Sequence, residues 1–209
     1  MQGKDLPKPI RTPLVLHWIG VLVARLTGWR AAGELPDLKK FVVIVAPHTS
    51  NWDLPVCVMF SFVLRLRGYW FGKHTIFWPP LGWILRAYGG IAIDRRSHHS
   101  FVYRAASLFK ERDVLVLAIA PEGTRAYTEY WKSGFYHIAV EAGVPIALAF
   151  LDFKHKRCGI GAVVYPTGNI KEDMDKIRDF YSRVEPRHPA LRSAVRLREE
   201  DPPPGNQQA

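Results

Sequence analysis

Apolar runs alternate along the chain with segments in which apolar residues recur at helical spacing, and this alternation predicts the secondary structure. The uninterrupted apolar runs are expected to form buried strands, which would span residues 41–46, 69–71, 91–93, 114–119, 144–151 and 161–165. The periodic segments are expected to form helices, which would span residues 54–66, 78–87, 134–142 and 170–184, with a further helix capped by Ser97. Strands that alternate with helices predict a single α/β domain, with a largely parallel sheet flanked by helices.

An apolar segment near the N-terminus, residues 14–28, predicts one more helix. Because most of its surface is apolar, it must bury that surface, and Trp18 and Arg25 favour a membrane interface over packing as an ordinary helix on the domain. The uncharged stretch is shorter than the ~20 residues that span a bilayer. No small-residue cleavage site follows it, so we expect a retained helix rather than a signal peptide. Its narrow polar or small face contains His17, Gly20, Ala24, Thr27 and Gly28.

The net charge of the chain limits the classes of partner that are expected. The 209 residues carry a formal net charge of +10, which favours an anionic partner such as nucleic acid, an anionic membrane surface or a phosphorylated substrate. Cys57 and Cys158 are the two cysteines and form no C-x-x-C pair, which argues against a zinc site or a disulfide scaffold. Two reduced core thiols in a reducing compartment are expected.

The first candidate for chemistry is the stretch His48 to Asp53, which follows the apolar run 41–46. A neutral imidazole can take a proton from a hydroxyl, and a carboxylate on its other ring nitrogen fixes the tautomer and stabilises the imidazolium. Ser50 is an alternative nucleophile, but two residues along a tight loop need not face the imidazole.

Two further loops contain residue types that can bind a phosphate group. Asp94-Arg95-Arg96 and Glu122-Gly123-Thr124-Arg125 each follow an apolar run. Because the carboxyl ends of parallel strands share one edge of a sheet, both loops are expected to converge with His48. Arg guanidinium matches phosphate oxygens in a bidentate fork, and a glycine lets backbone N–H groups approach an anion closely.

Four ordered motifs make residues 40–150 resemble the PlsC-like glycerolipid acyltransferases, also called lysophosphatidate or 1-acylglycerol-3-phosphate acyltransferases. The family's H-x-x-x-x-D motif matches His48 to Asp53, and its P-E-G-T-R block matches Pro121 to Arg125. Its G-x-x-x-[IV]-x-R and V-P-I blocks match Gly89 to Arg95 and Val144 to Ile146. The chain departs from the pattern at Pro47, where many members have Asn.

The resemblance implies transfer of a fatty acyl group from a thioester, acyl-CoA or acyl-carrier protein, to the free hydroxyl of lysophosphatidate, giving phosphatidate in phospholipid biosynthesis. His48 would be the general base and Asp53 would orient it, while Pro145 would shape the acyl side. No metal or cofactor is implied, and the enzyme would work on a membrane lipid surface at the cytoplasmic face of the inner (plasma) membrane. The implied phosphate-binding residues are Lys73, Arg95, Glu122, Gly123, Thr124 and Arg125.

The domain division that follows is a membrane-associating helix in residues 1–33, a catalytic domain in residues 34–186 and a basic tail in residues 187–209. The tail would carry at most one short helix and would be disordered from Asp201.

Three alternatives stay open at this stage. The same chemistry could serve another acceptor, such as a lyso-ornithine lipid or another lysophospholipid. A hydrolase could use Ser50. A non-enzymatic basic module could bind membranes or nucleic acid, although the basic residues form no continuous stripe and no nucleic-acid recognition motif is present.

Overall fold

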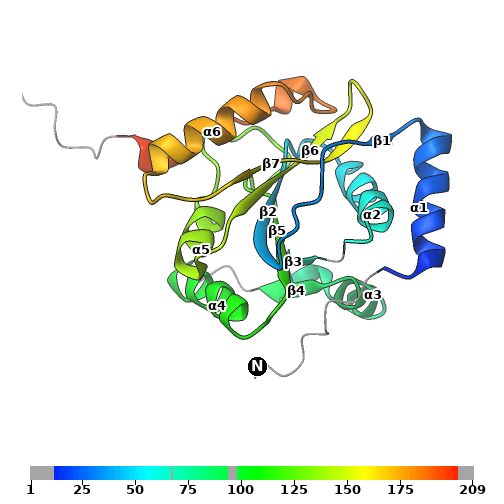
Figure 1. The fold of residues 1–209 in the computed structure, drawn as a ribbon, viewed down its shortest axis with the longest axis horizontal. Helices are drawn as coiled ribbons and strands as arrows, with labels where there is room; N and C mark the ends of the chain where they lie inside the picture. Colours follow the sequence, from blue (N-terminus) through cyan, green and yellow to red (C-terminus); the bar gives the residue numbers. More distant parts are fainter. Residues whose placement is uncertain (1–11, 67, 94–97, 202–209) are drawn as a thin grey trace, which may run out of the picture.

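The computed structural model describes residues 12–66, 68–93 and 98–201, which build one seven-stranded sheet with helices on both faces (Figure 1). The strand order is β1-β7-β6-β2-β5-β3-β4, and neighbouring strands are parallel except for the antiparallel β6–β7 hairpin. The predicted α/β fold with a largely parallel sheet is thereby confirmed. The strands are β1 Arg30–Ala31, β2 Lys40–Ala46, β3 Tyr69–Lys73, β4 Gly90–Ile93, β5 Leu115–Ile119, β6 Ile146–Asp152 and β7 Arg157–Val164.

Six α-helices lie within the described residues, and three short 3₁₀ turns accompany them. The helices are α1 Leu14–Thr27, α2 Asp53–Val63, α3 Leu81–Ala87, α4 His98–Lys110, α5 Gly134–Ala142 and α6 Ile170–Ser182. The 3₁₀ turns are η1 His74–Ile76, η2 Pro189–Leu191 and η3 Arg198–Glu200. None of the helices within these ranges is both long and apolar enough to cross a membrane.

Strand β2 lies at the centre of the sheet, between β5 and β6. Side chains of a strand alternate between the two faces, so Val42 and Ile44 join the core beneath α5 and α6, while Phe41 and Val43 pack on the opposite face. All four are at most 5% exposed. Burial on both faces fixes the position of the β2 carboxyl end, from which the candidate site is built.

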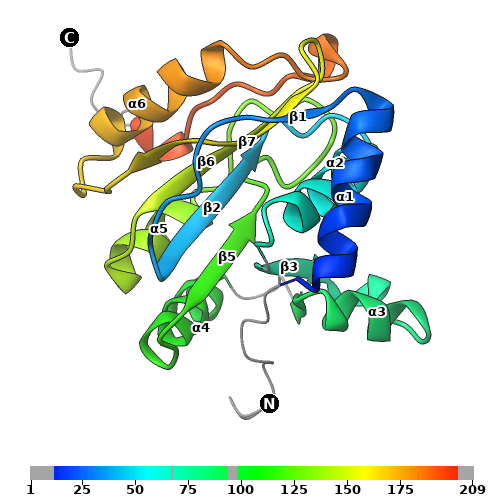
Figure 2. The same ribbon diagram turned by 45° about the vertical axis from the view of Figure 1, so that its right-hand side comes forward.

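Helix α1 packs against α2 (Figure 2). The face of α1 that meets α2 is its narrow face of polar and small residues. His17 Nδ1 lies 3.0 Å from the carbonyl oxygen of Val63, and Ala24 is buried. A Cβ added at Gly20 would lie 2.8 Å from Phe62 Cβ, so the close approach of the two helices requires glycine there. The apolar residues of α1 consequently point away from the protein, in the reverse of an ordinary amphipathic surface helix.

Several predicted boundaries are wrong. Helix α2 ends at Val63 rather than at residue 66, and α3 begins at Leu81, after the two prolines that were expected to start it. Strand β7 begins at Arg157 rather than residue 161, because pairing with β6 and β1 extends it beyond its apolar run. The proposed cap Ser97 lies outside the described residues.

The segment after α6 is folded back onto the domain over its described part. It contains two 3₁₀ turns rather than at most one short helix. Leu197 is fully buried and forms a β-bridge with Trp131. Of the stretch expected to be disordered, only Asp201 is described.

Candidate active site

The loop of residues 47–52, which contains His48, connects the end of β2 to the start of α2, where Asp53 is the first helical residue. His48 Nδ1 lies 2.8 Å from Asp53 Oδ2. Because a carboxylate accepts hydrogen bonds, Nδ1 carries the proton in the neutral imidazole and Nε2 keeps its lone pair. The His48 side chain is 21% exposed, whereas that of Asp53 is 1% exposed. The ring is therefore held from its buried side and accessible on the other.

Asp53 is itself held by its surroundings. Its Oδ2 also accepts a hydrogen bond of 2.9 Å from the backbone N–H of Ser50, and its place in the first turn of α2 favours a negative charge. The Ser50 hydroxyl accepts a hydrogen bond from the Trp52 N–H, which uses it within the loop. One turn along the helix, burial and the charge of Asp53 raise the pKa of the Cys57 thiol to about 12, so this thiol stays neutral and unreactive.

Glu122 joins the site from the loop after β5. Its Oε2 accepts a hydrogen bond of 2.7 Å from the backbone N–H of His48, and the residue is only 2% exposed. Burial raises the pKa of this carboxyl to about 8, reinforced by the charge of Asp53 and opposed by the His48 N–H and by Arg192. The expected convergence of the β2 and β5 loops is thus present, with the Glu122 carboxyl group turned toward the loop backbone.

A pocket of about 500 Å³ opens beside the loop. Arg125 lines it from the β5 loop, and residues of the segment after α6 line it as well. The Arg187 guanidinium lies over the rings of Trp52 and Phe153, at 5.4 and 5.8 Å from their centroids. The pocket is lined by Thr49, Ser50, Asn51, Trp52, Arg125, Ala126, Arg187, His188 and Leu191. Two guanidinium groups therefore border one pocket next to the residue that follows His48.

The other residues of the P-E-G-T-R block shape the β5 loop. Gly123 has a φ of 66°, in the left-handed region that glycine adopts without strain. The Thr124 hydroxyl accepts a hydrogen bond from the Ala126 N–H, and it lies on the exposed side of the loop. Both residues lie in the turn that leads to Arg125, which lines the pocket.

The remaining predicted residues lie farther from this pocket or outside the described chain. Lys73 is the last residue of β3, and Arg95 lies outside the described residues. Strand β4, which precedes Arg95, is separated from β2 by β5 and β3, on the order of 14 Å for three inter-strand spacings. Pro145 precedes the first residue of β6 and accepts a hydrogen bond from the Val42 N–H, so it lies at the opposite edge of the sheet from His48.

The sequence motifs did not reveal Arg187 or His188. The His188 N–H donates a hydrogen bond to Thr49 Oγ1 at 3.2 Å, which joins the C-terminal segment to the loop that carries His48. The sequence indicated a basic tail. Its packing against the loop that carries His48 could not be predicted, because it depends on contacts between residues far apart in the chain. Over the described residues, no group of three or more His, Cys, Asp or Glu side chains could hold a metal ion.

The sheet and the site define an acyltransferase-type α/β domain, and the chain belongs to the Acyltransferase family, whose model matches residues 30–148. One curated relative is the 1-acyl-sn-glycerol-3-phosphate acyltransferase of Haemophilus influenzae, 28% identical over 162 residues that cover 73% of this chain and 65% of the relative. A protein of the same name from Escherichia coli is 30% identical over 111 residues, which cover 50% of this chain and 44% of the relative.

A solved structure supports the fold assignment. The 1-acyl-sn-glycerophosphate (LPA) acyltransferase PlsC of Thermotoga maritima superposes with a TM-score of 0.55 at 19% identity. The match covers 78% of this chain and 73% of that structure. The chain spans about two-thirds or less of the curated relatives' length, and the matched family region ends at residue 148, well before Arg187.

Proposed function

We propose that the protein transfers a fatty acyl group from a thioester to the free hydroxyl of lysophosphatidate, giving phosphatidate. The observation that carries this proposal is the His48–Asp53 pair at 2.8 Å beside a pocket bordered by Arg125 and Arg187. The names of the relatives fit the same reaction. A base next to cationic groups suits an acceptor that has both a hydroxyl and a phosphate.

The proposed chemistry begins with Nε2 of His48, the ring nitrogen opposite the one that Asp53 holds. Nε2 takes the proton from the acceptor hydroxyl as its oxygen attacks the thioester carbonyl carbon. A tetrahedral intermediate forms and collapses by breaking the C–S bond. The imidazolium then gives its proton to the departing thiolate, while Asp53 stabilises the charged ring throughout. An ester, a thiol and the neutral imidazole result, so the proton balance closes.

Glu122 takes a positioning role in this scheme. The resemblance implied that it contacts phosphate, but its carboxyl is buried against the His48 N–H. We assign it to holding the loop that aims the imidazole. Phosphate binding falls to Arg125, with Arg187 as a second cation that the sequence motifs did not include; guanidinium groups suit a phosphate monoester because they form paired N–H···O bonds.

The donor is proposed to be acyl-CoA or acyl-carrier protein, with no metal or cofactor. The acceptor is a membrane lipid, and we place the enzyme on the cytoplasmic face of the inner membrane, where such thioesters are available. The outward apolar residues of α1 support contact with a lipid surface.

The proposal is tested with the purified full chain, an acyl thioester and a panel of detergent-dispersed lysolipids, by mass analysis of the products and by thiol release. We expect phosphatidate from lysophosphatidate in stoichiometric balance with thiol, and slower acylation of lysolipids whose headgroup lacks a phosphate monoester. Preferred acylation of a lyso-ornithine lipid would overturn the assigned acceptor. Release of free fatty acid in place of phosphatidate would overturn acyl transfer itself.

A further inference from the structure

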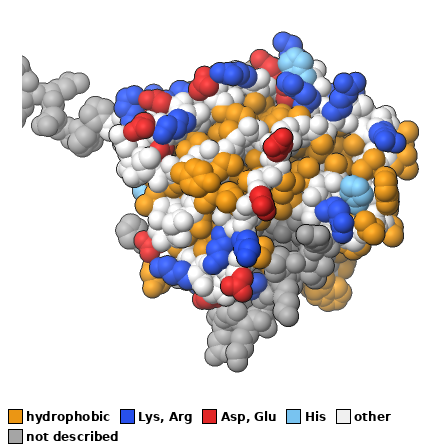
Figure 3. Space-filling view, viewed as in Figure 1, with side chains coloured by type: hydrophobic (Ala, Val, Ile, Leu, Met, Phe, Trp, Pro, Cys, Tyr) orange, Lys and Arg blue, Asp and Glu red, His pale blue; other side chains and the backbone are white. Residues whose placement is uncertain are grey.

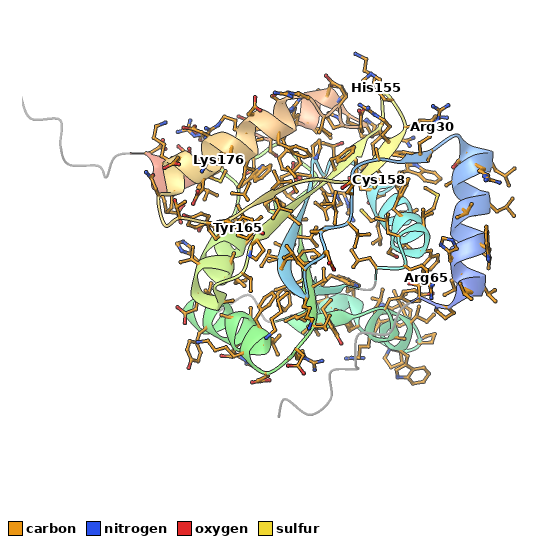
Figure 4. All side chains as sticks on the ribbon, in the orientation of Figure 1. Arg30, Arg65, His155, Cys158, Tyr165 and Lys176 are labelled. Carbon is orange, nitrogen blue, oxygen red and sulfur yellow. The ribbon has the colours of Figure 1, made fainter. Side chains whose placement is uncertain are left out.

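A group of basic side chains surrounds the turn between β6 and β7. We call Arg30, Lys154, Lys156 and Arg157 the basic turn cluster; all four residues are exposed. Arg30 and His155 mark its position, at the end of the hairpin and beside the C-terminal end of α1 (Figure 4). In space-filling view, Lys and Arg side chains gather at the upper right, above the hydrophobic side chains that follow α1 down the same edge (Figure 3).

The positive charges of the cluster are poorly compensated within the protein. Arg30 and Arg157 are direct register partners in the parallel β1–β7 pair, and like charges placed opposite each other destabilise a sheet. Among the described residues, Arg157 has one ion pair, with the buried Asp152 at 3.1 Å, and no carboxylate lies within ion-pair distance of Arg30, Lys154 or Lys156. An external anion would relieve this repulsion.

The cluster adjoins the exposed apolar side of α1. Lys156 Nζ donates a hydrogen bond of 3.1 Å to the carbonyl oxygen of Thr27, the last residue of α1. Leu26, one residue earlier, is 78% exposed, and Leu22, one turn earlier, is 57% exposed. We call the exposed apolar residues of this helix the outer face of α1; they are Leu14, Val15, Trp18, Ile19, Leu22, Val23 and Leu26.

The cluster also lies at the same edge of the sheet as the active site. Strands β2 and β6 are parallel, and Ala46 pairs with Phe150 near their carboxyl ends, so the turn after β6 follows the same edge as the loop that carries His48. Phe153, in that turn, contacts Arg187, which also lies over Trp52 in the pocket. Basic groups therefore extend from the end of α1 toward the proposed acceptor pocket.

We propose that the basic turn cluster binds the phosphates of anionic lipids while the outer face of α1 enters the apolar part of the same membrane surface. The pairing of uncompensated cations with an adjacent apolar helix face is what a bilayer surface complements: phosphates at headgroup level and acyl chains below. An acidic protein would complement the cations and leave the apolar face exposed. The inference extends the proposed function, because this orientation turns the active-site edge toward the membrane that holds the acceptor.

The test uses sedimentation of the full chain with vesicles of phosphatidylcholine alone and of phosphatidylcholine mixed with phosphatidylglycerol, at low salt. The test variant is the triple substitution Arg30→Gln, Lys154→Gln and Lys156→Gln, which spares the Arg157–Asp152 pair. At about 1 kcal/mol for each basic residue near an anionic surface, three of them correspond to roughly a 100-fold loss of affinity for the mixed vesicles. Binding to phosphatidylcholine alone should change little.

The matched control removes three exposed positive charges elsewhere, by Lys110→Gln, Lys171→Gln and Lys176→Gln. This control should keep its preference for anionic vesicles. A second variant, Leu22→Ser with Leu26→Ser, should weaken binding to both kinds of vesicle, because it removes apolar area. Circular dichroism and thermal melting of each variant establish that it is folded.

If the cluster variant and the control lose equal affinity for the mixed vesicles, the effect depends on net charge alone and the proposal is overturned. Unchanged binding of the cluster variant would overturn it directly. If the cluster variant keeps its preference for anionic vesicles but no longer binds an acidic acyl-carrier protein, the cluster binds a protein partner and the proposal is overturned. Acylation of detergent-dispersed lysophosphatidate should be unaffected by the cluster substitutions. If wild-type protein binds anionic vesicles but does not acylate lysophosphatidate, the proposed function is refuted and the proposed membrane binding is not.

Discussion

The buried carboxyl of Glu122 makes the stability of this protein depend on pH in an uncommon direction. Its pKa is raised from the usual 4.5 to about 8, so the folded protein holds this proton at pH values where the unfolded chain has released it. The stabilisation is fully present below the unfolded pKa and is lost as pH rises through the folded pKa. At about 1.4 kcal/mol for each unit of pKa, the full effect is on the order of 4 to 5 kcal/mol.

The substitution Glu122→Gln isolates this effect. The amide resembles the protonated carboxyl and keeps an oxygen that can accept from the His48 N–H, the hydrogen bond that Glu122 makes at 2.7 Å. We expect the unfolding free energies of the two proteins to be similar at about pH 5. At about pH 8 the variant should be the more stable by several kcal/mol, because wild type alone carries the cost of a buried charge.

Urea unfolding of both proteins across this pH range measures the difference between their unfolding free energies. The contributions of all other titrating groups cancel in this difference, because the two proteins share them. Parallel stability curves for wild type and Glu122→Gln would refute the reasoning, because the carboxyl would then titrate alike in the folded and unfolded states. Glu122→Ala serves as a contrast: it removes the acceptor as well and should reduce activity through loss of loop positioning.

Three further predictions concern the site and the N-terminal helix. Asp53→Asn should lower kcat by about 10²–10⁴-fold with little change in KM, because the amide no longer fixes the imidazole tautomer; steady-state kinetics with a little-changed kcat would contradict the role of Asp53. Arg125→Ala and Arg187→Ala should each raise KM for lysophosphatidate more than they lower kcat, and should have less effect on a phosphate-free acceptor; equal effects on both acceptors would remove the phosphate-binding role. Gly20→Val should loosen α1 from α2, because its Cβ would meet Phe62 Cβ at 2.8 Å; unchanged protease resistance of α1 would contradict that packing.

The parallel sheet and the contact between His48 and Asp53 could be predicted from the sequence because both depend on local signals. Long apolar runs mark central strands such as β2, and the spacing of His48 and Asp53 matches a strand-to-helix loop whose geometry closes the pair at 2.8 Å. The start of α6 also depends on a local signal, because the side chain of Asn169, which directly precedes the helix, accepts a hydrogen bond from the Glu172 N–H.

The parts that the sequence did not predict depend on contacts between distant segments. The hydrogen bond from the His48 N–H to Glu122 was not predicted, because it depends on the adjacency of β5 and β2, which no motif specifies. Arg187 lines the pocket because the segment after α6 returns to the loop that carries His48. The apolar surface of α1 could be recognised in the sequence, but the neighbouring basic turn cluster depends on the pairing of β1 with β7.

The central claim is that His48 is the base that activates the acceptor hydroxyl. It is tested most directly by comparing phosphatidate formation by wild type, His48→Ala and the control His137→Ala. His137 lies on α5, outside the pocket lining, and its Nε2 is 3.5 Å from Glu199 Oε1. We expect His48→Ala to lose about 10²–10⁴-fold or more in kcat, with melting temperature retained, and His137→Ala to keep wild-type turnover. Undiminished phosphatidate formation by folded His48→Ala would contradict the account.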